Sequence, residues 1–269
     1  MQALSTRSSP IAAIWAALLI GVSLWEIAAT RCDASSVPDD DAWDRAAAVV
    51  RAEFQPGDLI VFAPDWVDPV GRLHLGDLLS IDAAARMDAA RYPRIWELSI
   101  RGARAADTEG LDPLTDVDVD GVRVRRYEQA AVVVTADVRD HISEAKVDGA
   151  PLHAPSLEIA EVGFAPHRCI EVVPAPGKPV RIVFAQVALG RELVGYMGLA
   201  DVFTRREIRS PGKLAVEIGG ASAATVEAGV DDGWVRFAAP TTPGPTDVTF
   251  VLSASERDRL ICFAAEARQ

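Results

Sequence analysis

The clearest chemical pattern in the sequence is a run of alternating carboxylates before a glycine, made by Asp116, Asp118, Asp120 and Gly121. Calcium takes several oxygen ligands around a sharp turn, and such a run is typical of the opening of a calcium loop. The later positions depart from that pattern, because Arg123 takes the usual apolar position and Tyr127 stands where a bidentate acid belongs. Two interpretations remain: calcium as the one candidate cofactor, or a solvated acidic linker whose glycine starts a strand.

The sequence carries no familiar catalytic motif. Its histidines lack the spacing of a zinc site, and they are His74, His141, His153 and His167. A nucleophile elbow, a phosphate-binding P-loop and a dinucleotide fingerprint are all absent. Only a site assembled from distant residues would make this chain an enzyme, so the sequence favours a non-enzymatic protein.

A group of side chains that could bind a ligand follows two predicted strands. The carboxyl ends of parallel strands meet at one edge of a sheet, where ligands tend to bind. A tryptophan beside an acid and two guanidinium groups could stack on a sugar or hydrogen-bond an anionic head group. The alternative is a tryptophan packed under its own loop and solvated arginines. The residues are Asp65, Trp66, Arg101 and Arg104.

The elements that would hold this edge form a small α/β unit over residues 42–110. Apolar residues at helical spacing predict a helix from Trp43 to Phe54, with Asp41 as N-cap. A buried strand at 59–62, a helix at 77–90 and a strand at 94–100 follow. Strand, helix and strand at this spacing predict a right-handed parallel crossover.

After a loop at 103–120, residues 121–269 show many short strands separated by Pro- and Gly-rich turns, which is typical of a β-sandwich. The fold class is therefore α+β. Alternation predicts that Phe184, Val216, Phe250 and either Cys262 or Phe263 face inward. A short helix is expected at 137–146. The expected strands are 122–127, 131–136, 157–163, 169–173, 181–189, 214–218, 224–228, 234–238, 248–254 and 260–265.

The centre of this second half, residues 180–220, reads as a strand, a Gly-rich turn at Val194–Asp201, a polar loop and a second strand at 214–218. This stretch resembles the galactose-binding-like β-sandwich of non-catalytic carbohydrate-binding modules, in which a Gly-Leu-x-Asp turn joins two core strands. The resemblance implies a glycan partner. Loops at one end of a sandwich hold its adjustable polar groups, so the expected ligand residues there are Asp201, Arg205 and Arg206.

The first half resembles the soluble extracytoplasmic tail of membrane glycosyltransferases of the GT-C type, which use lipid-linked sugars. The resemblance rests on Trp43–Ala47, Pro56–Phe62 and Tyr92–Trp96. It implies an accessory soluble part of a glycosyltransferase system. The sequence has one apolar segment and lacks the multi-span region that carries catalysis in that family.

The N-terminal region, residues 1–32, predicts a membrane anchor or a cleaved signal sequence. An apolar run from Ile11 to Trp25 extends to Ala29, which approaches the length of a membrane span. Arg7 precedes it and an acidic linker at 33–41 follows it. A basic residue on the N-terminal side predicts a bacterial inner-membrane protein facing the periplasm, or a secreted one after cleavage.

Cys169 and Cys262 both fall in the predicted sandwich. An oxidising compartment would allow them to pair, with their Cα atoms about 4.4–6.8 Å apart. Two separately buried thiols are the alternative.

The net charge of −12 and the pI of about 4.8 argue against a nucleic-acid partner. The leading interpretation is an extracytoplasmic, non-enzymatic envelope protein that binds a glycan or another envelope protein. The alternatives are the glycosyltransferase accessory and a purely structural module.

Overall fold

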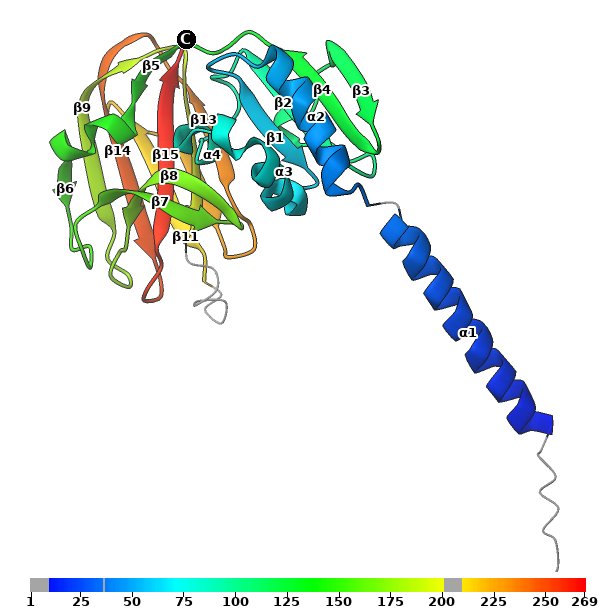
Figure 1. Ribbon diagram of the computed structural model, residues 1–269. Helices are drawn as coiled ribbons and strands as arrows, with labels where there is room; N and C mark the ends of the chain where they lie inside the picture. The colour runs from blue at the N-terminus through cyan, green and yellow to red at the C-terminus, as the bar shows by residue number, and fades with distance from the viewer. Residues whose placement is uncertain (1–9, 36, 201–209) are drawn as a thin grey trace, which may run out of the picture. The chain divides into compact units, whose positions relative to one another are not determined.

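The computed structural model describes residues 10–35, 37–200 and 210–269 (Figure 1). The chain forms two compact units. The first comprises Met1–Phe54, Val61–His74 and Trp96–Arg126. The second comprises Gln55–Ile60, Leu75–Ile95 and Tyr127–Gln269.

The N-terminal helix α1 runs from Pro10 to Ser35. A stretch of 20 residues within it, Ala13–Cys32, is long and apolar enough to cross a membrane, with a mean hydropathy of 1.7. None of that stretch is buried in the protein, and Trp25 is 75% exposed. A core helix of a soluble domain buries its apolar face. A membrane anchor and a signal sequence both fit this helix.

Helix α2 (Asp40–Glu53) follows the predicted helical spacing and buries Trp43, Ala46 and Val50 on one face. Its N-cap is Asp39, two residues before the expected Asp41. The Asp39 carboxylate accepts a hydrogen bond from the Ala42 amide at 2.9 Å. Such a cap satisfies one of the donors left over at the start of a helix.

A four-stranded sheet has the order β1-β2-β4-β3. The Ile100 amide donates to the Ala63 carbonyl at 3.0 Å, which joins the carboxyl ends of β1 and β2 as in the predicted parallel crossover. The strands are β1 (Leu59–Ala63), β2 (Arg94–Ser99), β3 (Thr115–Val119) and β4 (Val122–Glu128).

The crossover differs from the single predicted helix at 77–90. It contains α3 (Asp68–Leu75), the 3-10 turn η2 (Gly76–Leu78) and the short α4 (Ile81–Ala84), followed by an irregular segment to Pro93. Backbone carbonyls of that segment accept from distant amides instead of from the next helical turn. These bonds are Arg168 N–H to Ala85, Val132 N–H to Ala90 and Gln129 N–H to Pro93, at 2.8–2.9 Å.

A second difference from the sequence-based prediction concerns the strand at residues 122–127, which is predicted to belong to the sandwich. The strand is β4 of the four-stranded sheet and forms an antiparallel hairpin with β3. Asp120 and Gly121 have φ of 49° and 89°, the left-handed pair of a type I′ turn. Aspartates are uncommon in strands, which is why the sequence of β3 reads as a loop. The last segment of the first unit, Trp96–Arg126, ends within β4.

The second unit is the predicted antiparallel sandwich (Figure 1). One sheet has the order β13-β10-β15-β8-β7, with β5 also paired to β15. Its strands are β13 (Val235–Pro240), β10 (Glu192–Leu199), β15 (Ile261–Arg268), β8 (Ala165–Val172), β7 (Ser156–Val162) and β5 (Val134–Asp137). The other has the order β12-β11-β14-β9-β6, made by β12 (Ala221–Ala228), β11 (Gly212–Ile218), β14 (Gly244–Ala254), β9 (Val180–Leu189) and β6 (Lys146–Asp148). The 3-10 helix η4 (Val138–Glu144) replaces the expected helix at 137–146.

The sandwich core follows the predicted alternation. Phe184, Val216, Phe250 and Phe263 are at most 2% exposed and belong to one apolar cluster. The Phe250 ring meets Phe184 edge-on, with centroids 5.7 Å apart, and tilts against Phe263 at 4.9 Å. Phe263 takes the inward position, and its neighbour Cys262 points to the opposite side of the sheet, in a separate cluster.

The prediction of a Gly-rich turn at Val194–Asp201 is wrong, because residues 194–199 belong to strand β10, which lies between β13 and β15. A Cβ atom on Gly195 would lie 2.2 Å from the Phe237 ring and 2.5 Å from the Ala264 carbonyl. The glycine is needed for close approach within the sheet, not for a turn.

Candidate functional site

The face of β15 that points away from the sandwich core is also buried. Cys262, Ala264, Glu266 and Arg268 alternate onto this face and are at most 4% exposed. The segment Ile81–Pro93 lies over this face and is called the cover segment below. Its Met87 carbonyl accepts a hydrogen bond from the Trp234 indole at 3.1 Å, in addition to the backbone bonds given above. The cover lies within the second unit.

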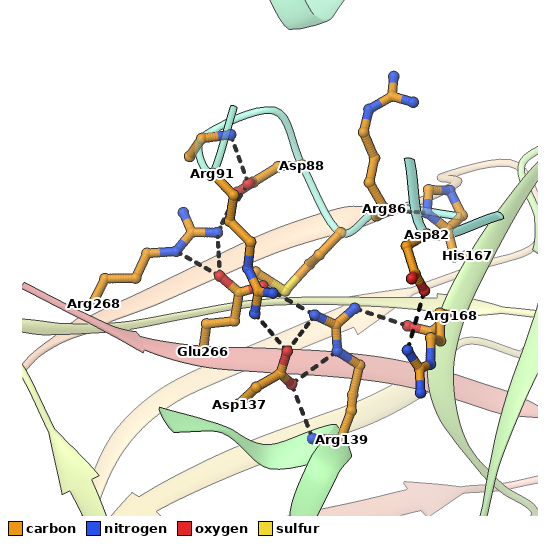
Figure 2. A network of polar contacts seen from close by, with 12 residues as sticks. Asp82, Arg86, Asp88, Arg91, Asp137, Arg139, His167, Arg168, Glu266 and Arg268 are labelled. Carbon is orange, nitrogen blue, oxygen red and sulfur yellow. Dashed lines mark hydrogen bonds and ion pairs between the residues drawn. The ribbon is translucent and has the colours of Figure 1, made fainter. Parts of the chain in front are cut away.

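Charged side chains connect the cover to the sheet in an ion-pair ladder (Figure 2). At one end, Arg268 donates to both oxygens of Asp88 at 2.9 Å and to Glu266 at 3.0 Å. In the middle, Arg91 and Arg139 each reach Glu266, at 2.9 and 3.0 Å. At the other end, both arginines reach Asp137 at 2.5 Å.

The ladder contains three guanidinium groups and three carboxylates, so its formal charges cancel. Asp137, Arg139, Glu266 and Arg268 are 1–8% exposed. Buried charges of this kind persist only when they are paired and hydrogen-bonded, and here each is. The ladder holds the guanidinium groups in fixed positions.

The pKa directions agree with these pairings. Burial alone would raise the pKa of the Asp137 carboxyl, but the hydrogen bond and charge of Arg139 outweigh it and hold that pKa below its ordinary value. Burial would lower the pKa of Arg139, yet the bond to Asp137 raises it instead. Burial, aided by the negative charge of Asp88, raises the pKa of Tyr196 to about 12. The Asp137 carboxylate is therefore ionised and the Tyr196 phenol neutral at pH 7.

A cavity of about 210 Å³ opens beside the ladder. Its size is below the roughly 300–1,000 Å³ of pockets for drug-sized ligands and suits a small polar molecule. Guanidinium donors, carboxylate acceptors and a phenol surround it. The lining residues are Asp82, Ala85, Arg86, Met87, Asp88, Arg91, Tyr92, Asp137, Arg139, Asp140, Arg168 and Glu266.

Three aromatic rings stack under the cover segment. Trp234 lies 4.4 Å from His167 and 5.9 Å from Tyr196, centroid to centroid, and both pairs are nearly parallel. The His167 ring also contacts the Arg86 carbonyl at 3.1 Å. These half-buried rings support the backbone of the cover and so keep the pocket wall in place.

Of the four side chains predicted to meet at one edge of the four-stranded sheet, the structure brings some together. The Arg101 guanidinium lies 5.9 Å from the centre of the Trp66 ring, and Trp66 is 59% exposed and not packed under its loop. Asp65 is exposed nearby in the chain, in the 3-10 turn η1 (Asp65–Val67). Arg104 bonds to the carbonyls of Thr108 and Leu111 and to the buried Glu97, so it stabilises a loop.

The three candidate calcium ligands lie on the β3–β4 hairpin. Asp116 pairs with Arg123 across the strands, and this hydrogen bond lowers the pKa of Asp116 below its ordinary value. Asp118 accepts from the Gly121 amide, and Asp120 pairs with Arg45 at 2.7 Å. Within residues 10–35, 37–200 and 210–269, no group of three or more His, Cys, Asp or Glu could hold a metal ion. The other ligand candidates, Asp201, Arg205 and Arg206, lie outside the described residues.

Cys169 and Cys262 are joined by a disulfide, with Cα atoms 5.5 Å apart. They connect the neighbouring strands β8 and β15 on the outer side of one sheet, beside Val162 and Ala200. The bond therefore fastens strands within a sheet and does not link the two sheets.

Sequence reasoning missed every residue of the ladder. The available signal was the end of β15, Ala264-Ala-Glu-Ala-Arg268, where two charges alternate within a run of small apolar residues. A charge in a buried strand calls for a partner. The partners come from segments more than 100 residues earlier in the chain, and no local pattern points to them.

No protein-family model and no curated protein matches this sequence. Among solved structures, the chain is similar to the CBM51-2 module in complex with GlcNAc and INT domains from Clostridium perfringens ZmpB, at 13% identity and a TM-score of 0.36 over 57% of this chain and 36% of that chain. It is also similar to a family 35 carbohydrate binding module from Clostridium thermocellum, at 10% identity and a TM-score of 0.32 over 51% and 98%. The chain spans 29% and 36% of the length of the two ZmpB structures that contain CBM51-2 and INT domains.

Proposed function

We propose that this protein is a non-catalytic glycan-binding protein held at a membrane, and that the pocket beside the ion-pair ladder is its binding site. The observation that carries the proposal is the composition of the pocket. Guanidinium groups, carboxylates and the phenol of Tyr92 surround a space of about 210 Å³. Sugar hydroxyls both donate and accept hydrogen bonds, and this lining offers donors on its arginines and acceptors on its exposed acids, Asp82 and Asp140.

The second support is preorganisation. The side chains of Arg91, Arg139 and Arg268 are already fixed by ion pairs before any ligand arrives. Less rotamer entropy is then lost on binding, which favours affinity in a small site. The buried lining carboxylates Asp137 and Glu266 are both engaged by arginines, which favours binding over nucleophilic or acid–base catalysis at these two residues.

The membrane part of the proposal rests on α1. At about 1.5 Å per residue its 26 residues extend roughly 39 Å, more than the ~30 Å hydrocarbon core. Arg7 on the N-terminal side supports, through the positive-inside rule, the proposal that the domains face the periplasm of a bacterial cell, or are secreted after cleavage. The glycan would then belong to the envelope.

Binding is tested on the full chain in lipid nanodiscs that contain no glycolipid. Isothermal titration with envelope monosaccharides, taken to millimolar concentration, should give saturable binding. Hydrogen-exchange mass spectrometry should then show protection confined to residues 81–93 and 137–140. Protection around Trp66 and Arg101 instead would move the site to the other unit, and no binding to any sugar leaves the structural-module interpretation.

A further inference from the structure

The buried carboxylates of the ladder have no capacity left to accept hydrogen bonds from a ligand. The Oδ1 atom of Asp137 accepts from the Arg139 amide and Nε at 3.0 and 2.9 Å, and its Oδ2 accepts from Arg139 and Arg91 at 2.5 Å. The Oε1 atom of Glu266 contacts Arg139 and Arg91, and its Oε2 accepts from Arg268 at 3.1 and 3.0 Å. Each oxygen has about two lone pairs, so all are occupied.

Two arginines of the pocket, in contrast, have donors to spare. A guanidinium group carries five N–H donors. Among the described residues, Arg91 uses only its Nη2 and Arg168 only its Nη1, the latter on Asp82 at 3.2 Å. Both side chains are 40% exposed, so their remaining donors reach the solvent of the pocket. The floor of the pocket therefore offers hydrogen-bond donors in excess of acceptors.

From this imbalance we infer that the pocket selects acidic glycans, by holding a carboxylate or phosphate group of the sugar on Arg91 and Arg168. The inference rests on the proposed function and adds the chemical class of the ligand. Guanidinium groups bind oxyanions through paired, charge-assisted hydrogen bonds that a neutral hydroxyl does not match. The two arginines come from the cover segment and from β8, and both line the same cavity.

The acids at the rim set the strength of this selection. Asp82 is 70% exposed and occupies Arg168 through one contact, so a ligand oxyanion can replace it at low cost. Asp140 is also exposed, and water and salt screen its repulsion. Since the ladder itself is neutral, the preference comes from directed N–H groups and not from a net positive field.

The test compares glucuronate, glucose 1-phosphate and glucose by isothermal titration against the full chain in nanodiscs, at constant ionic strength. Either acidic sugar should bind about tenfold or more tightly than glucose, the gain expected from one or two charge-assisted hydrogen bonds. The tighter of the two acidic sugars identifies a carboxylate or a phosphate as the natural group. Acetate and inorganic phosphate alone should bind more weakly than the corresponding sugar.

Two variants separate oxyanion recognition from recognition of hydroxyls. Arg168→Gln should reduce the affinity for the acidic sugar to near that for glucose. Asp82→Asn removes the internal competitor and should increase the affinity for the acidic sugar severalfold. Arg181→Gln is a matched control, because Arg181 is 44% exposed and pairs with Glu217 on the other sheet. The thermal midpoint of each variant checks that the fold is kept.

Equal binding of glucose and the acidic sugars, unchanged by Arg168→Gln, overturns this inference and leaves the proposed function standing. Weaker binding of the acidic sugar by Asp82→Asn also overturns it, because the ligand would then need an acceptor. Phosphate or acetate binding as tightly as the sugars contradicts selection of a glycan. Absence of binding to all three sugars contradicts the proposed function as well.

Discussion

Glu266 is a carboxylate at a strand position where an apolar side chain would ordinarily lie. It is 1% exposed and has alanines on both sides in β15. Arg91, Arg139 and Arg268 surround it, so its charge is compensated from three directions. Removing one member of such a group leaves an uncompensated buried charge, which costs more than the pairs themselves contribute. We infer that the ladder fixes one specific placement of the cover segment more than it adds stability.

The core residues could be predicted from sequence and the ladder residues could not. Phe184 and Phe250 follow the period-two alternation of their own strands, which is a local property. The ladder depends on pairs such as Arg91 with Asp137 and Asp88 with Arg268, which join distant parts of the chain. The proximity of Trp66 and Arg101 follows from the shared edge of parallel strand ends, and a ligand role for them stays a prediction.

Tyr196 gives a prediction at high pH. Its pKa is raised to about 12, whereas an unfolded tyrosine titrates near 10. Between these values the unfolded chain has lost the phenolic proton and the folded protein retains it. The free energy of unfolding should therefore fall as the pH rises from about 10 to 12.

Urea unfolding across that range measures the effect, and Tyr196→Phe is the comparison. The variant should show a smaller decrease over the same pH interval, since Phe has no proton to lose. Identical slopes for the two proteins would rule out a stabilised neutral phenol at this position.

At the scale of elements, two segments were misread because a local signal competed with a tertiary one. The glycines of β10 suggest a turn, but they allow close approach in the centre of a sheet. Residues 85–93 have helical composition, but their carbonyls bond to distant amides. Neither context can be deduced from neighbours in sequence. The strands of alternating bulky residues, in contrast, were located to within a few positions.

The glycine at 195 can be tested by adding one methyl group. Gly195→Ala forces a Cβ atom against the Phe237 ring and the Ala264 carbonyl. Such overpacking should lower the free energy of unfolding by about 1–3 kcal/mol in urea denaturation. Gly76→Ala is the control, because its added Cβ meets nothing within 4 Å. A cost for Gly195→Ala no larger than for the control would show that β10 tolerates a side chain there.

At the scale of the whole molecule, α1 is long and apolar enough to cross a membrane, and extraction from the membrane tests whether it does. If it is an uncleaved anchor, the full chain should stay in the membrane pellet after alkaline carbonate extraction. An arginine near the centre of a spanning helix costs about 2.5–3.5 kcal/mol, so Leu19→Arg should release a substantial fraction. Intact-mass measurement of the same samples detects cleavage, and a soluble, shortened product would establish a signal sequence instead.

The position of the cover segment in the sequence limits how the pocket can be transferred between genes. Residues 75–93 lie in the sequence between β1 and β2 of the four-stranded sheet, yet they belong to the second unit. A gene fragment encoding only the sandwich strands would lack the wall of the pocket and would expose the outer face of β15 to water. Recombination that shuffles modules as continuous pieces of coding sequence therefore cannot transfer this pocket intact. The pocket has to be transferred together with the α/β unit, because segments of that unit lie on both sides of the cover segment in the sequence.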